Sequence, residues 1–237
     1  VDALNSFMAR LRSSLSRTED LITEAAHRVR TPLATVRTQA EVTHRKLNKP
    51  EHKQAIRDMI RAIDESSRSA GQILDHAMVT FRADSLALDP LDLVALTTET
   101  CDRLAPTADL KDIAFVRRLP AGPVTFKGDG IMLQAALHNI LDNAIKYSPE
   151  DSDITIRIDV SSDIKLSIED QGWGFGDADL TSLTNRYSRG SNVGDVVGSG
   201  LGLTIADEVA RAHGGTLELS HSMEGQGACV SLILPYV

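Results

Sequence analysis

The sequence contains only two cysteines, Cys101 and Cys229, and neither has a neighbour at the short spacing of paired metal ligands. Their isolation argues against a disulfide framework and against structural zinc, and favours reduced thiols in a cytoplasm. A run of about 20 apolar residues, the length that a membrane-spanning helix needs, is also missing. The chain opens with no signal-peptide pattern, and it begins at Val1 rather than at Met.

An excess of positive charge is missing as well. The chain has 25 Lys and Arg residues against 33 Asp and Glu residues, which gives a net charge of −8 at pH 7. Binding to nucleic acid depends on basic patches that displace counterions, so we expect no nucleic-acid partner. With 42% hydrophobic and 24% charged residues, the 237-residue chain has the composition of a globular protein long enough for two domains.

The first domain, residues 1–85, carries two apolar seams with helical spacing. Apolar residues recur mostly at steps of 3 or 4 between residues 4 and 47, then residues 48–50 interrupt the pattern, and a second seam covers residues 56–81. The pattern predicts an antiparallel helical hairpin, and we expect this hairpin to be the part of the chain that dimerises. Two hairpins that form a dimeric four-helix bundle would bury the outer part of both stripes. The alternative is a monomeric hairpin that packs on the second domain.

The second domain, residues 86–237, follows a polar link at residues 82–90 and mixes helical and strand patterns. The fold class is therefore α+β, with the helical hairpin followed by an α/β sandwich. An irregular segment between residues 172 and 202 is typical of a lid over a ligand. The patterns predict helices at 91–104, 131–146 and 201–213, and strands at 113–117, 154–160, 164–169, 216–220 and 229–234.

Three features of the second domain are suited to bind a phosphate compound. On the helix predicted at 131–146, a row of two asparagines and a lysine shares one face, and amide oxygens suit Mg2+ while lysine neutralises phosphate. Residues 170–176 place an aspartate and three glycines after a strand, and residues 198–203 open the last helix with small residues that can approach an anion. Each feature alone is equally typical of a solvated helix face, a turn or a helix cap.

In this order, the three features resemble the N, G1 and G2 boxes of the ATP-binding domains of histidine kinases. The resemblance implies that the second domain is a catalytic ATP-binding domain that uses ATP and Mg2+. The matching residues are Asn139, Asn143, Lys146 and Tyr147 for the N box, Asp170, Gly172 and Gly174 for G1, and Gly198, Gly200, Leu201 and Gly202 for G2.

The resemblance also assigns roles to several of these residues. Asn143 would coordinate Mg2+, together with Asn139 on the same face, and Asp170 would accept a hydrogen bond from the adenine amino group. The ring of Tyr147 would pack near adenine, Lys146 would contact phosphate, and the G2 glycines would cover the phosphates.

The lid segment resembles the family less closely. Arg186 and Arg189 match the lid arginines of the family, and Arg186 would assist catalysis. Thr184 stands where the family commonly has phenylalanine, and Tyr187 occupies the next aromatic position.

The hairpin distinguishes histidine kinases from gyrases, mismatch-repair proteins, chaperones and serine kinases with the same ATP fold. Residues 27–33, His-Arg-Val-Arg-Thr-Pro-Leu, resemble the H box of sensor histidine kinases and imply that His27 is the phosphoacceptor. Thr31 matches the position that helps dephosphorylate the partner regulator. Arg28 replaces the usual acidic residue and cannot accept a proton. Glu24, three residues before His27, is therefore the candidate base, and water or a group from the ATP domain is the alternative.

The whole resemblance implies a homodimeric sensor histidine kinase of a two-component system. It would phosphorylate itself on His27 and pass the phosphoryl group to an aspartate of a response regulator receiver domain. Arg28 and Thr184 leave open a weakly active kinase that serves as an ATP-responsive scaffold for the regulator. The chain would be a cytoplasmic portion whose only membrane contact comes from a missing upstream segment, as in an inner-membrane sensor.

Overall fold

The computed structural model describes residues 2–84, 86–176, 180, 183–184, 200–222 and 227–236, with side chains from residue 17 onward. The chain divides into two compact units, Val1–Phe81 and Arg82–Val237. Within the described ranges, no helix combines the length and apolar character needed to cross a membrane.

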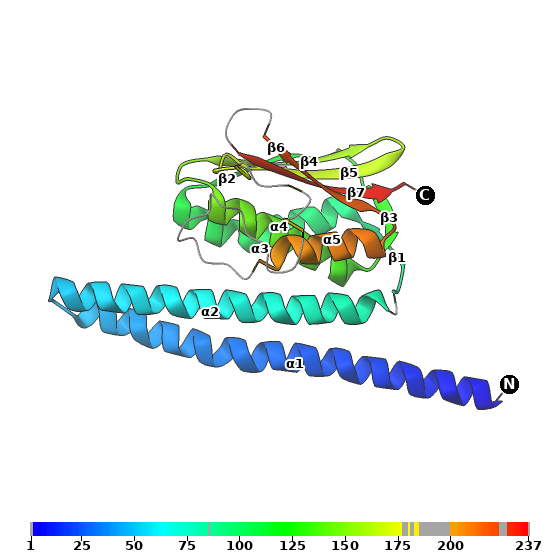
Figure 1. The fold of residues 1–237 in the computed structure, drawn as a ribbon, viewed down its shortest axis with the longest axis horizontal. Helices are drawn as coiled ribbons and strands as arrows, with labels where there is room; N and C mark the ends of the chain where they lie inside the picture. Colours follow the sequence, from blue (N-terminus) through cyan, green and yellow to red (C-terminus); the bar gives the residue numbers. More distant parts are fainter. Residues whose placement is uncertain are drawn as a thin grey trace. The chain divides into compact units, whose positions relative to one another are not determined.

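The first unit is the predicted helical hairpin. Helix α1 covers Asp2–Lys46, and helix α2 covers Pro50–Ala83 and ends in the second unit (Figure 1). Pro50 is the first residue of α2, where its missing N–H costs no helical hydrogen bond. The two helices are joined by an ion pair in which Arg37 Nε lies 2.9 Å from Asp64 Oδ1.

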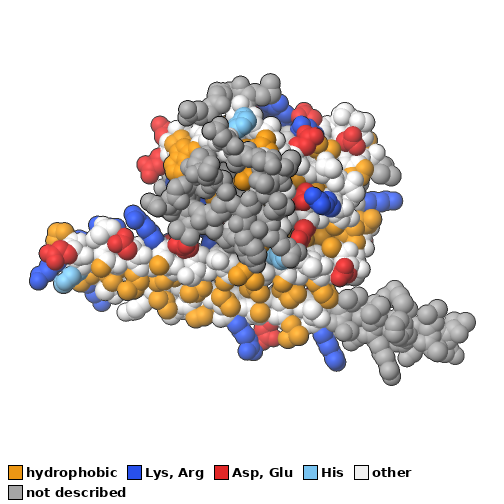
Figure 2. All heavy atoms as spheres, in the orientation of Figure 1, with side chains coloured by type: hydrophobic (Ala, Val, Ile, Leu, Met, Phe, Trp, Pro, Cys, Tyr) orange, Lys and Arg blue, Asp and Glu red, His pale blue; other side chains and the backbone are white. Residues whose placement is uncertain are grey.

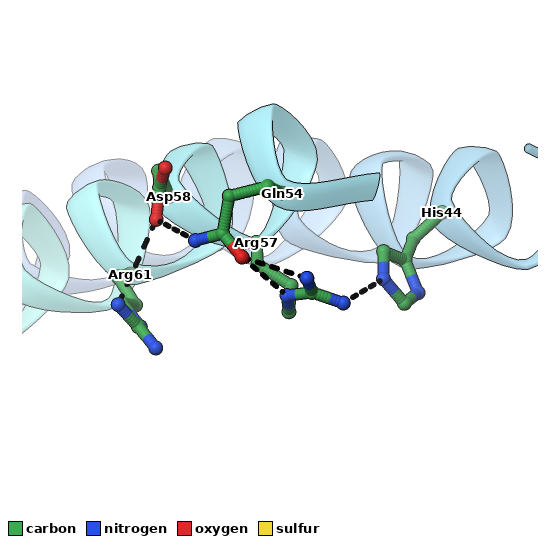
Figure 3. A network of polar contacts seen from close by, with 5 residues as sticks. All are labelled: His44, Gln54, Arg57, Asp58 and Arg61. Carbon is green, nitrogen blue, oxygen red and sulfur yellow. Dashed lines mark hydrogen bonds and ion pairs between the residues drawn. The ribbon is translucent and has the colours of Figure 1, made fainter. Parts of the chain in front are cut away.

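Close to the turn, a chain of polar contacts also joins α1 to α2 (Figure 3). Arg57 donates to Nε2 of His44 over 3.5 Å and to Oε1 of Gln54 over 2.7 Å. Gln54 in turn donates to Asp58, which pairs with Arg61. Because arginine can only donate, Nε2 of His44 is the acceptor in this hydrogen bond. His44 therefore has a structural partner on the opposite helix.

The hairpin leaves large apolar side chains exposed. Figure 2 shows hydrophobic side chains in orange along its described part. An exposed apolar stripe on a long hairpin is the kind of surface that a second hairpin covers in a four-helix bundle. The exposed side chains, each at least 39% accessible, are Leu21, Val29, Val36, Val42, Met59 and Ile73.

The second unit is built on a five-stranded sheet in the order β2-β4-β5-β7-β6, and its helices cover one face of that sheet (Figure 1). Strands β2 and β4 are parallel, and the other neighbours are antiparallel. Alternate residues face the helices, as Ile154, Ile156 and Ile158 do, with at most 3% of each residue exposed. The strands are β2 (Ala114–Arg118), β4 (Asp153–Val160), β5 (Asp163–Glu169), β6 (Thr216–His221) and β7 (Ala228–Pro235).

The helices of this unit are α3 (Leu93–Ala108), α4 (Gly130–Tyr147) and α5 (Gly202–Ala212), and a short helix η1 (Asp109–Lys111) follows α3. Helix α4 contacts both α3 and α5. Its apolar face is buried, because five side chains of that face are at most 3% exposed. These are Leu133, Leu137, Ile140, Leu141 and Ala144.

The helix predicted at 91–104 starts later than expected, and a small sheet was missed. Residues Asp89–Asp92 form β1, which pairs antiparallel with β3 (Thr125–Gly128). Asp92 ends the strand and caps α3, since its Oδ1 accepts from the N–H of Val94 and of Val124 at 3.0 Å each. The polar link predicted at 82–90 is correspondingly shorter, because α2 continues to Ala83.

Asp129, at the start of α4, is buried and forms hydrogen bonds with three separate parts of the chain. Its Oδ1 accepts from the N–H of Ile131 and Met132, and its Oδ2 lies 2.6 Å from Nη1 of Arg82. Its own N–H donates to Nε2 of His213 over 2.9 Å. The side chain of Asp129 is only 3% exposed and that of Arg82 17%, so this ion pair is largely shielded from water.

We predict that Asp129→Ala lowers the free energy of unfolding of the second unit by about 3 kcal/mol, because it removes a helix cap and a carboxylate that is ion-paired with a largely buried guanidinium. Asp129→Asn keeps the capping oxygen and should lose less. Urea unfolding followed by the fluorescence of Trp173, the only tryptophan in the chain, measures both changes. Asp159→Ala, at an exposed position of β4, is the control with almost no expected effect. Equal stability of Asp129→Ala and the parent would contradict the prediction.

Candidate functional site

The predicted polar row of α4 points toward the start of α5. Asn139 is only 1% exposed, and its Nδ2 donates to the carbonyl of Ala135 over 2.9 Å. A Cβ atom at Gly202 would lie 3.0 Å from Nδ2 of Asn143 and 3.4 Å from Oδ1 of Asn139. The first turn of α5 can therefore approach α4 this closely because residue 202 is a glycine. The alternative of a solvated helix face is wrong for Asn139.

Asp170 lies directly after β5 and is 6% exposed. Its Oδ1 accepts from the N–H of Gly172 at 2.8 Å and from that of Ala228 at 3.1 Å. Burial raises the pKa of the Asp170 carboxyl above its usual value, and these two hydrogen bonds oppose the rise. Since both donors bind Oδ1, the other oxygen, Oδ2, is the one available to a ligand.

The turn after Asp170 rests on the last turn of α4. A Cβ atom at Gly172 would lie 2.5 Å from the carbonyl oxygen of Tyr147, a distance that no side chain can occupy. Gly174 has a φ of +64°, in the left-handed region that favours glycine. Both positions of the G1 motif therefore favour glycine. At Gly172 there is no space for a side chain, and at Gly174 the backbone conformation is one that glycine adopts most easily.

Lys146 and Tyr147 form a contact at the end of α4. Nζ of Lys146 lies 3.3 Å from the hydroxyl oxygen of Tyr147 and 4.8 Å from the centre of its ring. The ammonium and the aromatic ring thus stay together beside the Gly172 turn. A cation and a ring face next to a buried carboxylate are suited to a ligand that has both phosphates and an aromatic base.

The third motif is described only in part. Gly200 has a φ of +69°, Leu201 is 3% exposed, and Gly202 begins α5. The structure thus brings the N-box, G1 and described G2 residues together. The predicted site residues Gly198, Arg186 and Arg189 lie outside the described residues.

The H-box residues are placed separately, on α1 in the first unit. His27, Arg28 and Thr31 are exposed there. The Nη2 and Nε atoms of Arg28 donate to Oε1 of Glu24 over 2.6 and 3.0 Å. The carboxylate that we considered as a base for His27 is therefore held by the guanidinium of Arg28.

Acidic or histidine metal clusters do not occur in the described part of the chain, where no three His, Cys, Asp or Glu side chains come together to hold an ion. A cation at this site would instead use amide oxygens. Asn143, which is half-buried, is better exposed for this purpose than the fully buried Asn139. Two amide oxygens are too few for Mg2+, so phosphate and water oxygens would complete its shell.

The sequence reading missed several residues that position the site. Asp129 had a usable signal, since an aspartate precedes the apolar period of α4 as helix caps do. His213 is 6% exposed and accepts the N–H of Asp129, a contact that no local pattern of the sequence indicates. No sequence pattern indicates the role of Lys111, because its partners are main-chain carbonyls more than 30 residues away.

The second part of the chain matches a known family. Residues 128–237 match the family described as "Histidine kinase-, DNA gyrase B-, and HSP90-like ATPase". These residues, which include α4, the Asp170 turn and α5, are similar to the ATPase domains of that family.

Over almost its whole length, the chain is similar to sensor histidine kinases. It is 30% identical over 236 residues to the sensor protein kinase PmrB of Pseudomonas aeruginosa, a match that covers 99% of this chain and 49% of PmrB. It is 28% identical over 233 residues to the signal transduction histidine-protein kinase/phosphatase MprB of Mycobacterium sp. (strain KMS), covering 94% of this chain and 44% of MprB. The chain thus spans about half the length of these relatives.

A solved structure agrees with this relation. The structure of the mycobacterial sensor histidine kinase MprB is 28% identical and matches with a TM-score of 0.57, covering 62% of this chain and 97% of that one. The predicted fold class, a helical hairpin followed by a domain built on a sheet, is confirmed.

Proposed function

We propose that this chain is the catalytic core of a protein histidine kinase that binds ATP, phosphorylates itself on His27 and passes the phosphoryl group to an aspartate of a response regulator. The convergence of three distant segments supports the proposal most strongly: the end of α4, the Asp170 turn and the start of α5 meet within contact distance. The relation to sensor histidine kinases supports the same function.

In this proposal, the base of ATP binds at Asp170. Oδ2 of Asp170 accepts a hydrogen bond from the adenine amino group, and Tyr147 packs near the adenine ring. Lys146 lies against the ring of Tyr147, from where it can reach a phosphate. The positive end of the α5 dipole lies at Gly202. The main-chain N–H groups at the start of this helix are therefore suited to bind the phosphates of ATP. Gly198, Arg186 and Arg189 would complete the phosphate site from the lid.

Mg2+ fits the same site through Asn143. Its half-buried amide can offer an oxygen to the ion, and the buried Asn139 lies on the same face of α4, where both side chains face Gly202. When bound, Mg2+ would neutralise charge on the phosphates of ATP.

The phosphoryl transfer joins the γ-phosphorus of ATP to a ring nitrogen of His27, and breaks the bond to the leaving oxygen of ADP. The attacking imidazole is neutral: the ring nitrogen that bears the lone pair attacks phosphorus, and the proton on the other ring nitrogen leaves as neutral phosphohistidine forms. The chemistry depends on alignment and charge neutralisation more than on covalent help from the protein.

A direct experiment tests the function. Incubation of the purified chain with ATP labelled in the γ-phosphate and Mg2+ should label the protein, and the label should be lost in acid and survive alkali, as expected for a phosphoramidate. An acid-stable label would indicate a serine kinase instead. Complete absence of label in a chain that binds ATP would favour the scaffold hypothesis.

The oligomer and partners belong to the same proposal. The exposed apolar stripe of the hairpin supports a homodimer in which two hairpins form a four-helix bundle. A receiver domain of a response regulator would accept the phosphoryl group, and Thr31, exposed near His27, would assist its later hydrolysis. We place the chain on the cytoplasmic side of an inner-membrane sensor, by analogy with its sensor relatives.

The Arg28–Glu24 pair favours a second candidate function, a weakly active kinase that acts as an ATP-responsive scaffold for a response regulator. An arginine beside the phosphoacceptor cannot take a proton, and here it also engages the nearest carboxylate. Slow autophosphorylation is therefore expected.

We predict that Arg28→Glu speeds autophosphorylation and that Glu24→Gln slows it roughly tenfold, because a positioned general base contributes at least this much. ATP affinity should not change in either variant. Initial rates of labelling at saturating ATP measure both effects, with Arg45→Glu, at an exposed position near the end of α1, as the control. An unchanged rate in Glu24→Gln would mean that Glu24 is not the base. A slower Arg28→Glu would mean that Arg28 takes part in the mechanism.

A further inference from the structure

Lys111, at the end of η1, is bound to the C-terminal end of α4. Its Nζ donates to the carbonyl oxygens of Ile145 at 2.9 Å, Lys146 at 3.2 Å and Ser148 at 2.7 Å. An ammonium group has three N–H donors, and three carbonyls lie within reach of them. The main-chain carbonyl of Lys111 also accepts the N–H of Asp151 over 3.0 Å, so the contact includes the chain beyond the helix.

The chemistry of a helix end explains this contact. The last carbonyls of a helix have no donor within the helix and form the negative end of its dipole. A cation that approaches them satisfies these oxygens and opposes the dipole. Here the cation comes from a residue 34 positions before Ile145 in the sequence, so it fixes the end of α4 to another element.

The turn that Lys111 holds is also the turn on which the candidate nucleotide site is built. It includes Lys146 and Tyr147, and Asn143 lies one turn earlier. The carbonyl oxygen of Tyr147 lies so close to Gly172 that a Cβ there would approach it to 2.5 Å. A displacement of this turn by a few tenths of an ångström would therefore change its contact with the Asp170 turn.

We propose that Lys111 is a positioning residue for nucleotide binding. Its ammonium fixes the last turn of α4, which keeps the N-box side chains and the Asp170 turn at the separation that one nucleotide can bridge. Lys111 acts through main-chain carbonyls and not by contact with the nucleotide. This inference rests on the proposed ATP site, and it names a residue outside the three motifs.

Two variants and one control test the inference. Lys111→Met keeps most of the side-chain length without the charge, and it should raise the Kd for ATP-Mg2+ roughly tenfold, as expected for loss of a partly buried cation at a helix end. Lys111→Arg keeps a cation with several donors and should recover most of the affinity. Lys127→Met removes an exposed ammonium of β3 and should bind like the parent. Calorimetry well below the unfolding temperature gives the three values of Kd.

Hydrogen exchange without nucleotide separates this inference from the proposed function. In Lys111→Met, the amides of residues 144–148 and of Gly172 should exchange faster than in the parent, while those of β6 should not change. If the parent does not bind ATP, the proposed function fails, and the exchange data still decide whether Lys111 holds the Asp170 turn. Parent-like exchange at Gly172 overturns the inference, and so does parent-like Kd in Lys111→Met with only a lower unfolding temperature. Should Lys111→Met not fold, Lys111→Gln takes its place in both measurements.

Discussion

Asp170→Asn is expected to weaken ATP binding roughly 100-fold while the protein stays folded, because it replaces a charged acceptor by a donor at the adenine amino group. The structure fixes the orientation of the new amide. Oδ1 of residue 170 must accept from the N–H of Gly172 and of Ala228, so the oxygen of asparagine will occupy that position. Its NH2 group then takes the place of Oδ2 and faces the amino group of adenine, and two donors cannot bind each other.

The stability of the same variant should depend on pH in a defined direction. Burial raises the pKa of Asp170, so the folded chain still holds a proton at pH values where the unfolded chain has released it. The contribution of Asp170 to the free energy of unfolding therefore falls as the pH rises from the ordinary carboxyl pKa through the raised value. Asparagine has no such proton. Relative to the parent, Asp170→Asn should become more stable as the pH rises through this interval.

Calorimetry with ATP-Mg2+ and urea unfolding at several pH values measure the two effects of Asp170→Asn. Asp159→Asn, at an exposed position of β4, is the matched control and should change neither. Parent-like affinity in Asp170→Asn would remove Asp170 from the nucleotide site. A loss of stability that grows with pH would show that the buried carboxylate stabilises the fold.

His27→Gln is expected to abolish autophosphorylation completely, because glutamine keeps a polar side chain of similar reach and has no nucleophilic nitrogen. ATP binding should stay unchanged, since His27 lies in the first unit and the proposed nucleotide residues in the second. The label from γ-labelled ATP measures the first effect, and calorimetry measures the second.

His44→Gln is the matched control on the same helix. His44 accepts a hydrogen bond from Arg57 across the hairpin, which gives it a structural role (Figure 3). This variant should keep its label, with at most a small loss of hairpin stability. A label that survives in His27→Gln would show that His27 is not the acceptor. A label that disappears in His44→Gln would contradict the structural role of His44.

The fold could be predicted from the sequence wherever one element contains its own pattern. The apolar face of α4 follows from a helical period within 18 residues, and strand β4 follows from alternation within eight. Strands β1 and β3 have only four residues each, and Pro90 weakens the pattern of β1. Their pairing depends on contacts between residues 89 and 128, which no local period reveals.

The site was predictable as a set of residues and not as a geometry. The three motifs could be found in the sequence because they resemble a family, and their relative placement depends on contacts between residues that are 25 positions apart, as Gly172 and Tyr147 are, or 59 positions apart, as Gly202 and Asn143 are. The contact of Lys111 with α4 and the pairing of Arg28 with Glu24 also required the structure. In both cases a lysine or arginine had several partners within reach, and only packing decides among them.

The assembly of the site from separate segments has a consequence for the stability of the second unit. Asp170 is hydrogen-bonded to Ala228, and α4 lies against Gly172 and Gly202, so an unfolded chain retains none of these juxtapositions. A nucleotide that binds there would bind the native state alone. By mass action, each tenfold rise in nucleotide concentration above its Kd would then add about 1.4 kcal/mol to the free energy of unfolding. The nucleotide in the cell would thus stabilise the folded state of this unit.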